Sequence, residues 1–280
     1  MIPFNFQYSK PQTIQEAVRQ FYEYNRENKK AFYFSGGTEL ITLGRLNLVY
    51  ADAVIDLKGI HEYSSIFFYE NYLVIGGGAT LTAIEEANVF PLLGKTASEI
   101  ADRTSRNKIT IGGNICGQIF YREAILPLLI SDCLLGISEA GGIVYQPIHK
   151  IFNKQIHLKE GEFIFSILID KMYVTMPFVS IKRRKQWDVG YPLVTVAAIK
   201  KENLIRMAVS GVCPFPFRSL EMEKALNEKG LPVEERVETA LRSMPGPVLS
   251  DVEGSAEYRL FVLKNTMIDA IGELEGERGV

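Results

Sequence analysis

Two short glycine-rich segments decide how this chain folds: Ser35–Glu39 (SGGTE) and Arg106–Asn114 (RNKITIGGN). Each places a Gly-Gly pair beside hydroxyl or amide side chains, so that unobstructed backbone N–H groups can converge on one anion, such as a pyrophosphate. Neither segment is the GxxxxGK[ST] of a P-loop or a GxGxxG that opens a dinucleotide-binding helix. Gly76–Ala79 (GGGA) comes nearest to the latter motif but lacks its third spaced glycine. The two segments together therefore indicate a nucleotide cofactor bound by neither of these motifs.

The residues around the first segment predict a helix, a strand, a glycine loop and a second helix. Thr13 and Glu16 form a capping-box pattern before a helical apolar repeat. The apolar run at 31–34 predicts a strand, and the second helix is expected to begin near Thr38. A strand that delivers a glycine turn to a helix N-terminus suits a phosphate, because the helix adds free N–H groups and a positive dipole end. The Glu39 carboxylate is expected to accept hydrogen bonds from a ribityl or ribose hydroxyl, or to cap the helix.

The second segment is expected to be a turn between helices, with its glycines allowing close backbone approach to a ligand. A strand is predicted at 73–75, and Thr82 with Glu85 predicts the start of a helix. A further helix around 97–103 is expected to lead into the second segment. Thr110 and Asn114 would supply polar side chains there. We expect a ligand on both glycine segments.

The rest of the chain predicts antiparallel strands followed by helices. Runs at 134–137 and 143–148 predict a hairpin, which makes Gly141–Gly142 a turn with no ligand role. Later strands are expected at 173–181, 193–199 and 204–209, and helices at 220–229, 233–243 and 255–274. Strands followed by helices is the α+β order.

Composition is that of a globular protein with no preference for nucleic acid. The chain has 280 residues, 47% hydrophobic and 23% charged, with a formal net charge of −2. This length leaves room for two or three packed units. No basic stripe, membrane-length apolar stretch or signal-peptide core is visible. We therefore expect a cytoplasmic protein without membrane or nucleic-acid partners.

Cysteine and histidine usage argues against a metal centre in this chain. The three cysteines and three histidines are widely spaced: Cys116, Cys133, Cys213, His61, His149 and His157. An all-cysteine iron–sulfur cluster needs four thiolates in close groups, and no zinc spacing is present either. Cys116 is expected to lie in the core. A flavoprotein without its own metal fits these limits.

Read together, the two segments resemble those of the FAD-binding subunit of the molybdenum hydroxylases, the group that includes xanthine dehydrogenase and carbon monoxide dehydrogenase. The resemblance continues through Gly161–Ile164, Arg183–Asp188 and Gly254–Arg259. It implies an α+β protein with a two-subdomain FAD-binding fold of the molybdenum hydroxylase/vanillyl-alcohol oxidase type, plus a C-terminal domain of antiparallel sheet and helices. The implied divisions are 1–58, 59–170 and 171–280, with FAD held between these parts.

The resemblance also implies which residues contact the cofactor. They are Tyr33, Phe34, Ser35, Gly36, Gly37, Thr38, Glu39 and Leu40 in the first loop, Thr110, Ile111, Gly112, Gly113 and Asn114 in the second, and Ile100, Glu123, Phe165, Lys182 and Asp188 elsewhere. Glu123 stands where the family has an aspartate that contacts the ribityl chain of the flavin, and its side chain is one methylene longer than that aspartate. Ile100 and Phe165 fit equally well as core residues. Ser180 occupies a frequent lysine position of the family, which makes Lys182 the candidate replacement, and Asp188 matches the loop beside the isoalloxazine ring.

The resemblance implies a function without a catalytic side chain, because the flavin carries the chemistry. Non-covalent FAD would take electrons from an iron–sulfur subunit, itself supplied by a molybdenum-cofactor subunit that oxidises a purine such as xanthine, and pass them to NAD⁺. The iron–sulfur clusters and the molybdenum cofactor would lie only on those partner subunits.

Three other functions compete with this one. A carbon monoxide or aromatic-substrate hydroxylase fits as well, since substrate choice lies on another chain. A stand-alone reductase like the enolpyruvyl reductases of cell-wall synthesis matches the C-terminal half poorly. A flavin-free structural subunit of the same fold stays open because of the altered region around Glu123.

Overall fold

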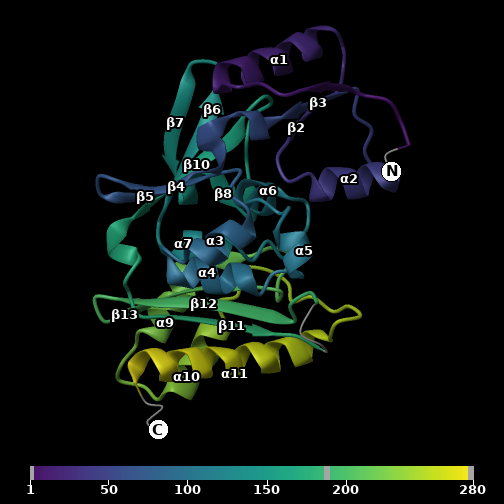
Figure 1. The fold of residues 1–280 in the computed structure, drawn as a ribbon. Helices are drawn as coiled ribbons and strands as arrows, with labels where there is room; N and C mark the ends of the chain where they lie inside the picture. The colour runs from purple at the N-terminus through teal and green to yellow at the C-terminus, as the bar shows by residue number, and fades with distance from the viewer. Residues whose placement is uncertain (1–2, 186–189, 277–280) are drawn as a thin grey trace. The chain divides into compact units, whose positions relative to one another are not determined.

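The computed structural model describes residues 3–185 and 190–276, which form two compact units (Figure 1). Unit 1 comprises the described residues of 1–87, 103–118 and 133–171, and unit 2 those of 88–102, 119–132 and 172–280. Both glycine segments belong to unit 1. The division implied at 58/59 and 170/171 stays a prediction.

A small parallel sheet in unit 1 carries the first glycine segment. Its strand order is β1 (Gln7–Ser9), β3 (Ala53–Asp56), β2 (Ala31–Phe34). The central strand β3 is buried along its whole length. Helix α1 (Ile14–Arg26) begins as predicted, because the Thr13 hydroxyl accepts a hydrogen bond from the Glu16 N–H. Helix α2 (Thr38–Arg45) begins directly after the glycines, which confirms the predicted strand, loop and helix.

A five-stranded antiparallel sheet forms the other half of unit 1. Its order is β4 (Ile66–Tyr69), β5 (Tyr72–Gly76), β10 (Phe163–Asp170), β6 (Leu134–Glu139), β7 (Gly142–Pro147). The predicted β6–β7 hairpin is confirmed. The central strand β10 was not predicted from local pattern, because its first five residues are all buried and show no alternation.

Short elements complete unit 1. They are 3₁₀ turns at Leu57–Gly59 and His61–Ser64, helices α3 (Leu81–Ala87), α5 (Arg103–Arg106), α6 (Ile111–Cys116) and α8 (Ile148–Ile151), and the strand pair β8 (Phe152–Asn153) and β9 (Gln155–Ile156). The two sheets share a core in which α1 contributes Val18 and Phe21, and Tyr63 and Phe165 pack against it. This shared core joins the two sheets into one unit.

Two predicted helix boundaries are wrong. The Thr82–Glu85 capping box does not form, because α3 begins at Leu81 and the Thr80 hydroxyl accepts from the Ala83 N–H. The helix expected around 97–103 is interrupted: α4 (Pro91–Ser98) ends near its start, and Ala101 has a φ of 48°. A left-handed residue stops an α-helix, and neither change is visible in apolar spacing.

Unit 2 is an antiparallel sheet with helices on it, as the sequence predicts. The strand order is β11 (Phe178–Arg183), β12 (Val194–Lys201), β13 (Leu204–Ser210), β14 (Phe217–Arg218), and the helices are α4, α7 (Ile125–Ile130), α9 (Leu220–Leu226), α10 (Val233–Leu241) and α11 (Ala256–Glu275). The strand predicted from 173 begins only at Phe178, because 171–173 forms a 3₁₀ turn. Helix α11 packs on β11 and β12, and its buried side chains join the unit's core. Among the described residues, no helix is long and apolar enough to cross a membrane.

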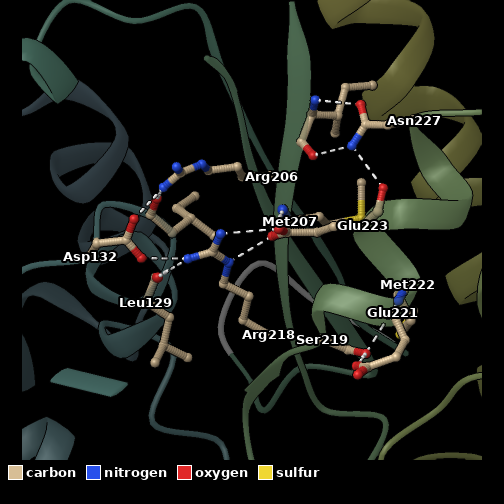
Figure 2. A network of polar contacts seen from close by, with 12 residues as sticks. Leu129, Asp132, Arg206, Met207, Arg218, Ser219, Glu221, Met222, Glu223 and Asn227 are labelled. Atoms are coloured by element: carbon tan, nitrogen blue, oxygen red, sulfur yellow. Dashed lines mark hydrogen bonds and ion pairs between the residues drawn. The ribbon is translucent and has the colours of Figure 1, made fainter. Parts of the chain in front are cut away.

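A polar network ties helix α7 to the sheet of unit 2 (Figure 2). Arg218 donates to Asp132 and to the Leu129 carbonyl at the end of α7, and it forms a two-bond pair with Glu223 at 2.7 and 3.0 Å. Arg206 also donates to Asp132. Guanidinium groups at a helix C-terminus satisfy its carbonyls and complement its dipole. Arg218 is thus the centre of this network.

Replacing Arg218 by methionine is expected to lower the free energy of unfolding by about 3 kcal/mol, because it leaves the buried Glu223 carboxylate unpaired. Urea unfolding measures the change. Lys224→Met, an exposed site on the same helix α9, serves as control and should stay within about 0.5 kcal/mol of the parent. Equal losses in the two variants would contradict this role.

The same network predicts a dependence of stability on pH. Burial alone raises the pKa of Asp132, but the Arg206 hydrogen bond and the Arg218 charge outweigh it and hold this pKa below the ordinary 3.8. A carboxyl with a lowered folded pKa stabilises above its unfolded pKa, and this contribution is lost as pH falls through the folded pKa. The stability difference between the parent and Asp132→Asn should therefore be constant from pH 7 to 5 and shrink below pH ~4. Urea midpoints measured across this range test it, and a constant difference down to pH 3 would refute it.

Candidate functional site

The first glycine loop presents an open helix N-terminus. Gly37 has a φ of 71° and stands at the N-cap of α2, where no side chain caps the helix. Among the described residues, the N–H groups of Gly36, Gly37 and Thr38 have no backbone acceptor. An uncapped first turn with a positive dipole end is suited to an anion. The structure therefore leaves this loop able to bind one, as the sequence indicates.

The second glycine segment differs from the prediction. Gly112 and Gly113 lie in the first turn of α6, not in a loop, and Thr110 is the N-cap. The Ile111 N–H donates to the Ala79 carbonyl and the Gly112 N–H to the Gly77 carbonyl, at 2.9 and 2.8 Å. The prediction of bare amides at Gly112 and Gly113 was wrong, since the Gly113 N–H also has an acceptor, the Thr110 hydroxyl oxygen at 3.3 Å. The glycine at 112 is instead required by close packing, since a Cβ there would lie 2.8 Å from the Gly77 oxygen.

Unit 1 brings the two segments into direct contact. A Cβ on Gly36 would lie 1.8 Å from the carbonyl oxygen of Lys108, so no other residue fits without separating the backbones. The hydroxyls of Ser35 and Thr110 form a hydrogen bond of 2.8 Å, and the Thr110 oxygen also accepts from the Gly113 N–H. The two segments, some seventy-five residues apart, thus form one structure.

Tyr63 is a further part of this structure that the sequence did not reveal. Its hydroxyl donates to the Ser35 Oγ at 3.1 Å, and the residue is 2% exposed. Burial raises the pKa of Tyr63, so it stays a neutral donor. A lone tyrosine in the segment HEYS carries no pattern that would have found it. Tyr63, Ser35 and Thr110 make a chain of three hydroxyls across the two loops.

Lys58 places a positive charge beside the first loop and was also missed. Its Nζ donates to the Ser35 carbonyl at 2.9 Å and to Asp56 Oδ1 at 2.7 Å, and it lies 4.2 Å from the centre of the Phe34 ring. Tyr8 donates to the other Asp56 oxygen. Burial alone raises the pKa of Asp56, but the hydrogen bonds from Lys58 and Tyr8 outweigh the effect of burial, so this pKa lies below its ordinary value.

Glu39 links α2 to the far end of α6. Both its carboxylate oxygens accept from the Gln118 N–H, at 2.8 and 3.0 Å. A Cβ on Gly117 would lie 2.6 Å from one of them, so this glycine permits the contact. The carboxylate therefore has a donor within the protein, and its other lone pairs stay available, so the contact with a ribityl or ribose hydroxyl stays a prediction. Cys116 beside it is exposed, which corrects the expectation that it lies in the core.

Phe34 and Leu40, on either side of the first loop, line an apolar cavity of about 160 Å³. Tyr33 instead packs into the core: its ring stacks on Phe21 and its hydroxyl donates to the Gly161 carbonyl. Phe165 is likewise a core residue. Of the predicted residues in unit 1, the loop residues are assembled into a site and these two aromatic residues support it.

Glu123 and Lys182 form a buried pair in unit 2. The Lys182 Nζ donates to Glu123 Oε2 and to the Glu99 carbonyl, both at 2.8 Å, and Thr195 donates to Glu123 Oε1 at 2.6 Å. Burial raises the pKa of Glu123 and lowers that of Lys182, while their pairing opposes both shifts. Both carboxylate oxygens therefore have donors within the protein.

The other two predicted residues outside unit 1 are Ile100 and Asp188. Ile100 is buried in unit 2. Asp188 lies outside the described residues.

The loops of unit 1 fit the phosphate and hydroxyl groups of a nucleotide. The Asn114 Oδ1 is buried and accepts no hydrogen bond from the described residues. A buried acceptor without a donor is costly, so it favours a ligand that supplies an N–H or O–H. The open amides of α2 supply the complementary anion site. Within the described part of the chain, no cluster of side chains could hold a metal ion.

Comparison with known proteins identifies the family. Residues 4–171 match the family described as the FAD binding domain in molybdopterin dehydrogenase. The chain belongs to this family. The match covers both glycine segments and all of unit 1 except its first residues.

Relatives extend the likeness over the whole chain. The xanthine dehydrogenase FAD-binding subunit of Escherichia coli O157:H7 is 25% identical, with 97% of each chain covered. The glyceraldehyde dehydrogenase medium chain of Sulfolobus acidocaldarius is 26% identical, with 98% of this chain and all of that one covered.

Carbon monoxide dehydrogenase from Hydrogenophaga pseudoflava has a chain of the same fold, with a TM-score of 0.88, 21% identity and 99% of each chain covered. The α+β fold and the family inferred from the sequence are confirmed.

The close approach of the loops predicts the effect of a minimal substitution. Gly36→Ala is expected to lower the free energy of unfolding by about 1–3 kcal/mol and to abolish FAD retention, because its methyl group would displace the Lys108 carbonyl. Denaturant unfolding and the flavin-to-protein ratio measure the two effects. The control is Gly141→Ala in the β6–β7 turn, where a Cβ has nothing within 4 Å. Full flavin content in Gly36→Ala would disprove the role of this contact.

Proposed function

We propose that this chain is the FAD-carrying electron-transfer subunit of a multi-subunit molybdenum hydroxylase. The observation that supports this most is the direct contact of its two glycine segments, through Gly36 with Lys108 and Ser35 with Thr110, inside the stretch that matches the FAD-binding family. FAD supplies hydride and single-electron chemistry when it is bound. The protein's part is to bind and orient it.

The residues of unit 1 divide the binding between them. The N–H groups at the start of α2 suit the pyrophosphate, with the Lys58 cation beside the same loop. The Asn114 oxygen suits a hydroxyl or amino donor of the nucleotide. The hydroxyl chain from Tyr63 to Thr110 holds the two loops together beside these groups.

The partners in this proposal are an iron–sulfur subunit and a molybdenum-cofactor subunit. The names of the relatives support it, since they are a FAD-binding subunit and a medium chain. We propose xanthine as the substrate of the complex, NAD⁺ as the acceptor and the cytoplasm as the location. Relatives named for glyceraldehyde and carbon monoxide keep the substrate open to experiment, and carbon monoxide or aromatic compounds are the alternatives.

The purified protein should show a flavin absorption spectrum that NADH bleaches under anaerobic conditions. Acid should release the FAD, because the glycine loops contain no cysteine or histidine to bind it covalently. Cys116 is exposed directly beyond the second loop, so Cys116→Ser is the matched control and should change neither result. Colour retained on the acid-treated parent but lost in Cys116→Ser would reveal a covalent link.

Other outcomes separate the remaining alternatives. A colourless protein that binds no added FAD would favour the flavin-free structural subunit. Flavin that NADH cannot reduce would exclude NAD⁺ as the acceptor. Xanthine turnover should require both partner subunits, and turnover by this chain alone would overturn the proposal.

A further inference from the structure

Lys58 holds the peptide unit that joins Ser35 to Gly36, in the first glycine loop. Its Nζ donates a hydrogen bond of 2.9 Å to the Ser35 carbonyl oxygen. A trans peptide is planar, and its C=O and N–H groups point in opposite directions. The Gly36 N–H therefore points away from the Lys58 ammonium. This N–H is one of the three at the start of α2 that have no backbone acceptor among the described residues.

The Lys58 ammonium has further partners within the protein. It donates to Asp56 Oδ1 at 2.7 Å and lies 4.2 Å from the centre of the Phe34 ring. Asp56 is 5% exposed, and Tyr8 donates to its other oxygen at 2.7 Å. Two of the three ammonium donors are thus used, and the adjacent carboxylate neutralises the charge. This arrangement suits a group that holds the Ser35 carbonyl, not one that attracts an anion by net charge.

The peptide unit needs this restraint because a glycine follows it. Glycine has no Cβ to limit its backbone angles, so a peptide unit beside it can rotate and reverse the direction of its N–H. The Ser35 hydroxyl is already fixed by its bonds with Thr110 and Tyr63, and Lys58 adds the bond to the carbonyl. A carbonyl that accepts from an ammonium also polarises its own amide, which makes the N–H on the opposite side a stronger donor.

We propose that Lys58 is a positioning residue for the pyrophosphate of FAD, and that it acts through the Ser35–Gly36 peptide without touching the cofactor. Asp56, supported by Tyr8, holds the ammonium in place. The inference rests on the proposed function, since it takes FAD as the ligand of this loop. Both residues lie outside the glycine segments, Asp56 at the end of β3 and Lys58 in the 3₁₀ turn that follows.

Direct attraction and positioning predict opposite effects of a change at Asp56. If the ammonium attracted the pyrophosphate by its charge, Asp56→Asn would leave that charge unneutralised and strengthen FAD binding. If the ammonium orients the peptide, the same change loosens it and weakens FAD binding. Asparagine has nearly the shape of aspartate, so the variant alters the charge and changes the packing little.

Isothermal titration calorimetry on the full chain freed of FAD tests the proposal, with FAD and ADP as probes. Both carry the pyrophosphate, and ADP lacks the flavin. Lys58→Met should weaken both probes by about tenfold, as expected for the loss of one hydrogen bond made to a charged group. Asp56→Asn should weaken both by about threefold, because a neutral partner holds the ammonium less firmly. Lys58→Arg keeps a charged donor and should stay within about threefold of the parent.

The matched control is Lys171→Met in the same unit. Lys171 is also exposed, and its ammonium lies 5.3 Å from the centre of the Phe68 ring, but it makes no printed contact with either glycine segment. This variant should bind both probes as the parent does. Urea unfolding of every variant checks the fold. Should Lys58→Met fail to fold, the sign of the change in Asp56→Asn decides the question.

Several results would overturn the positioning role and leave the proposed function standing. They are FAD binding in Lys58→Met as tight as in the parent, a loss for FAD without one for ADP, tighter binding in Asp56→Asn, and a loss in Lys58→Arg as large as in Lys58→Met. A parent protein that binds neither FAD nor ADP would instead overturn the proposed function, and this inference with it.

Discussion

The candidate site depends on one close approach, that of the Gly36 backbone to the Lys108 carbonyl. At this point the chain tolerates no Cβ, because the added atom would lie 1.8 Å from the oxygen. The hydrogen bond between the Ser35 and Thr110 hydroxyls forms beside it, and Tyr63 and Lys58 also donate hydrogen bonds to Ser35. A helix N-terminus binds an anion only if it is held in place, so this contact fixes the open amides of α2 before any ligand arrives.

The paired glycines serve different physical purposes, although they look alike in sequence. Gly36 and Gly112 are required by neighbouring backbone, and Gly37 by its positive φ and by the Phe34 ring that a Cβ would strike. A Cβ on Gly113 would approach only the Thr110 hydroxyl oxygen, at 2.9 Å. Most of the glycine signal therefore reports how the loops pack on each other, and only indirectly how they bind a ligand.

Local signals in the sequence predicted the elements that carry the site, and long-range contacts decided what it missed. Thr13 capped α1 and the glycines preceded α2 because both effects act within a few residues. The break in the expected helix at Ala101 depends on a single dihedral angle. The contact of Tyr63 with Ser35 depends on tertiary packing. No periodicity encodes either feature.

The position of Glu123 shows how a resemblance can find a residue without giving its role. A carboxylate at this place was expected to face the ribityl chain, yet both its oxygens accept from Lys182 and Thr195. Burying two charges is costly, and their attraction offsets this cost only when further hydrogen bonds satisfy the remaining lone pairs and protons. For Lys182, the Glu99 carbonyl accepts one such bond. Removing one partner would leave the other charged and buried. The pair therefore acts first as a support that joins the segments before α7 and after α4 to strand β11, and any contact it makes with a cofactor has to be made without giving up these bonds.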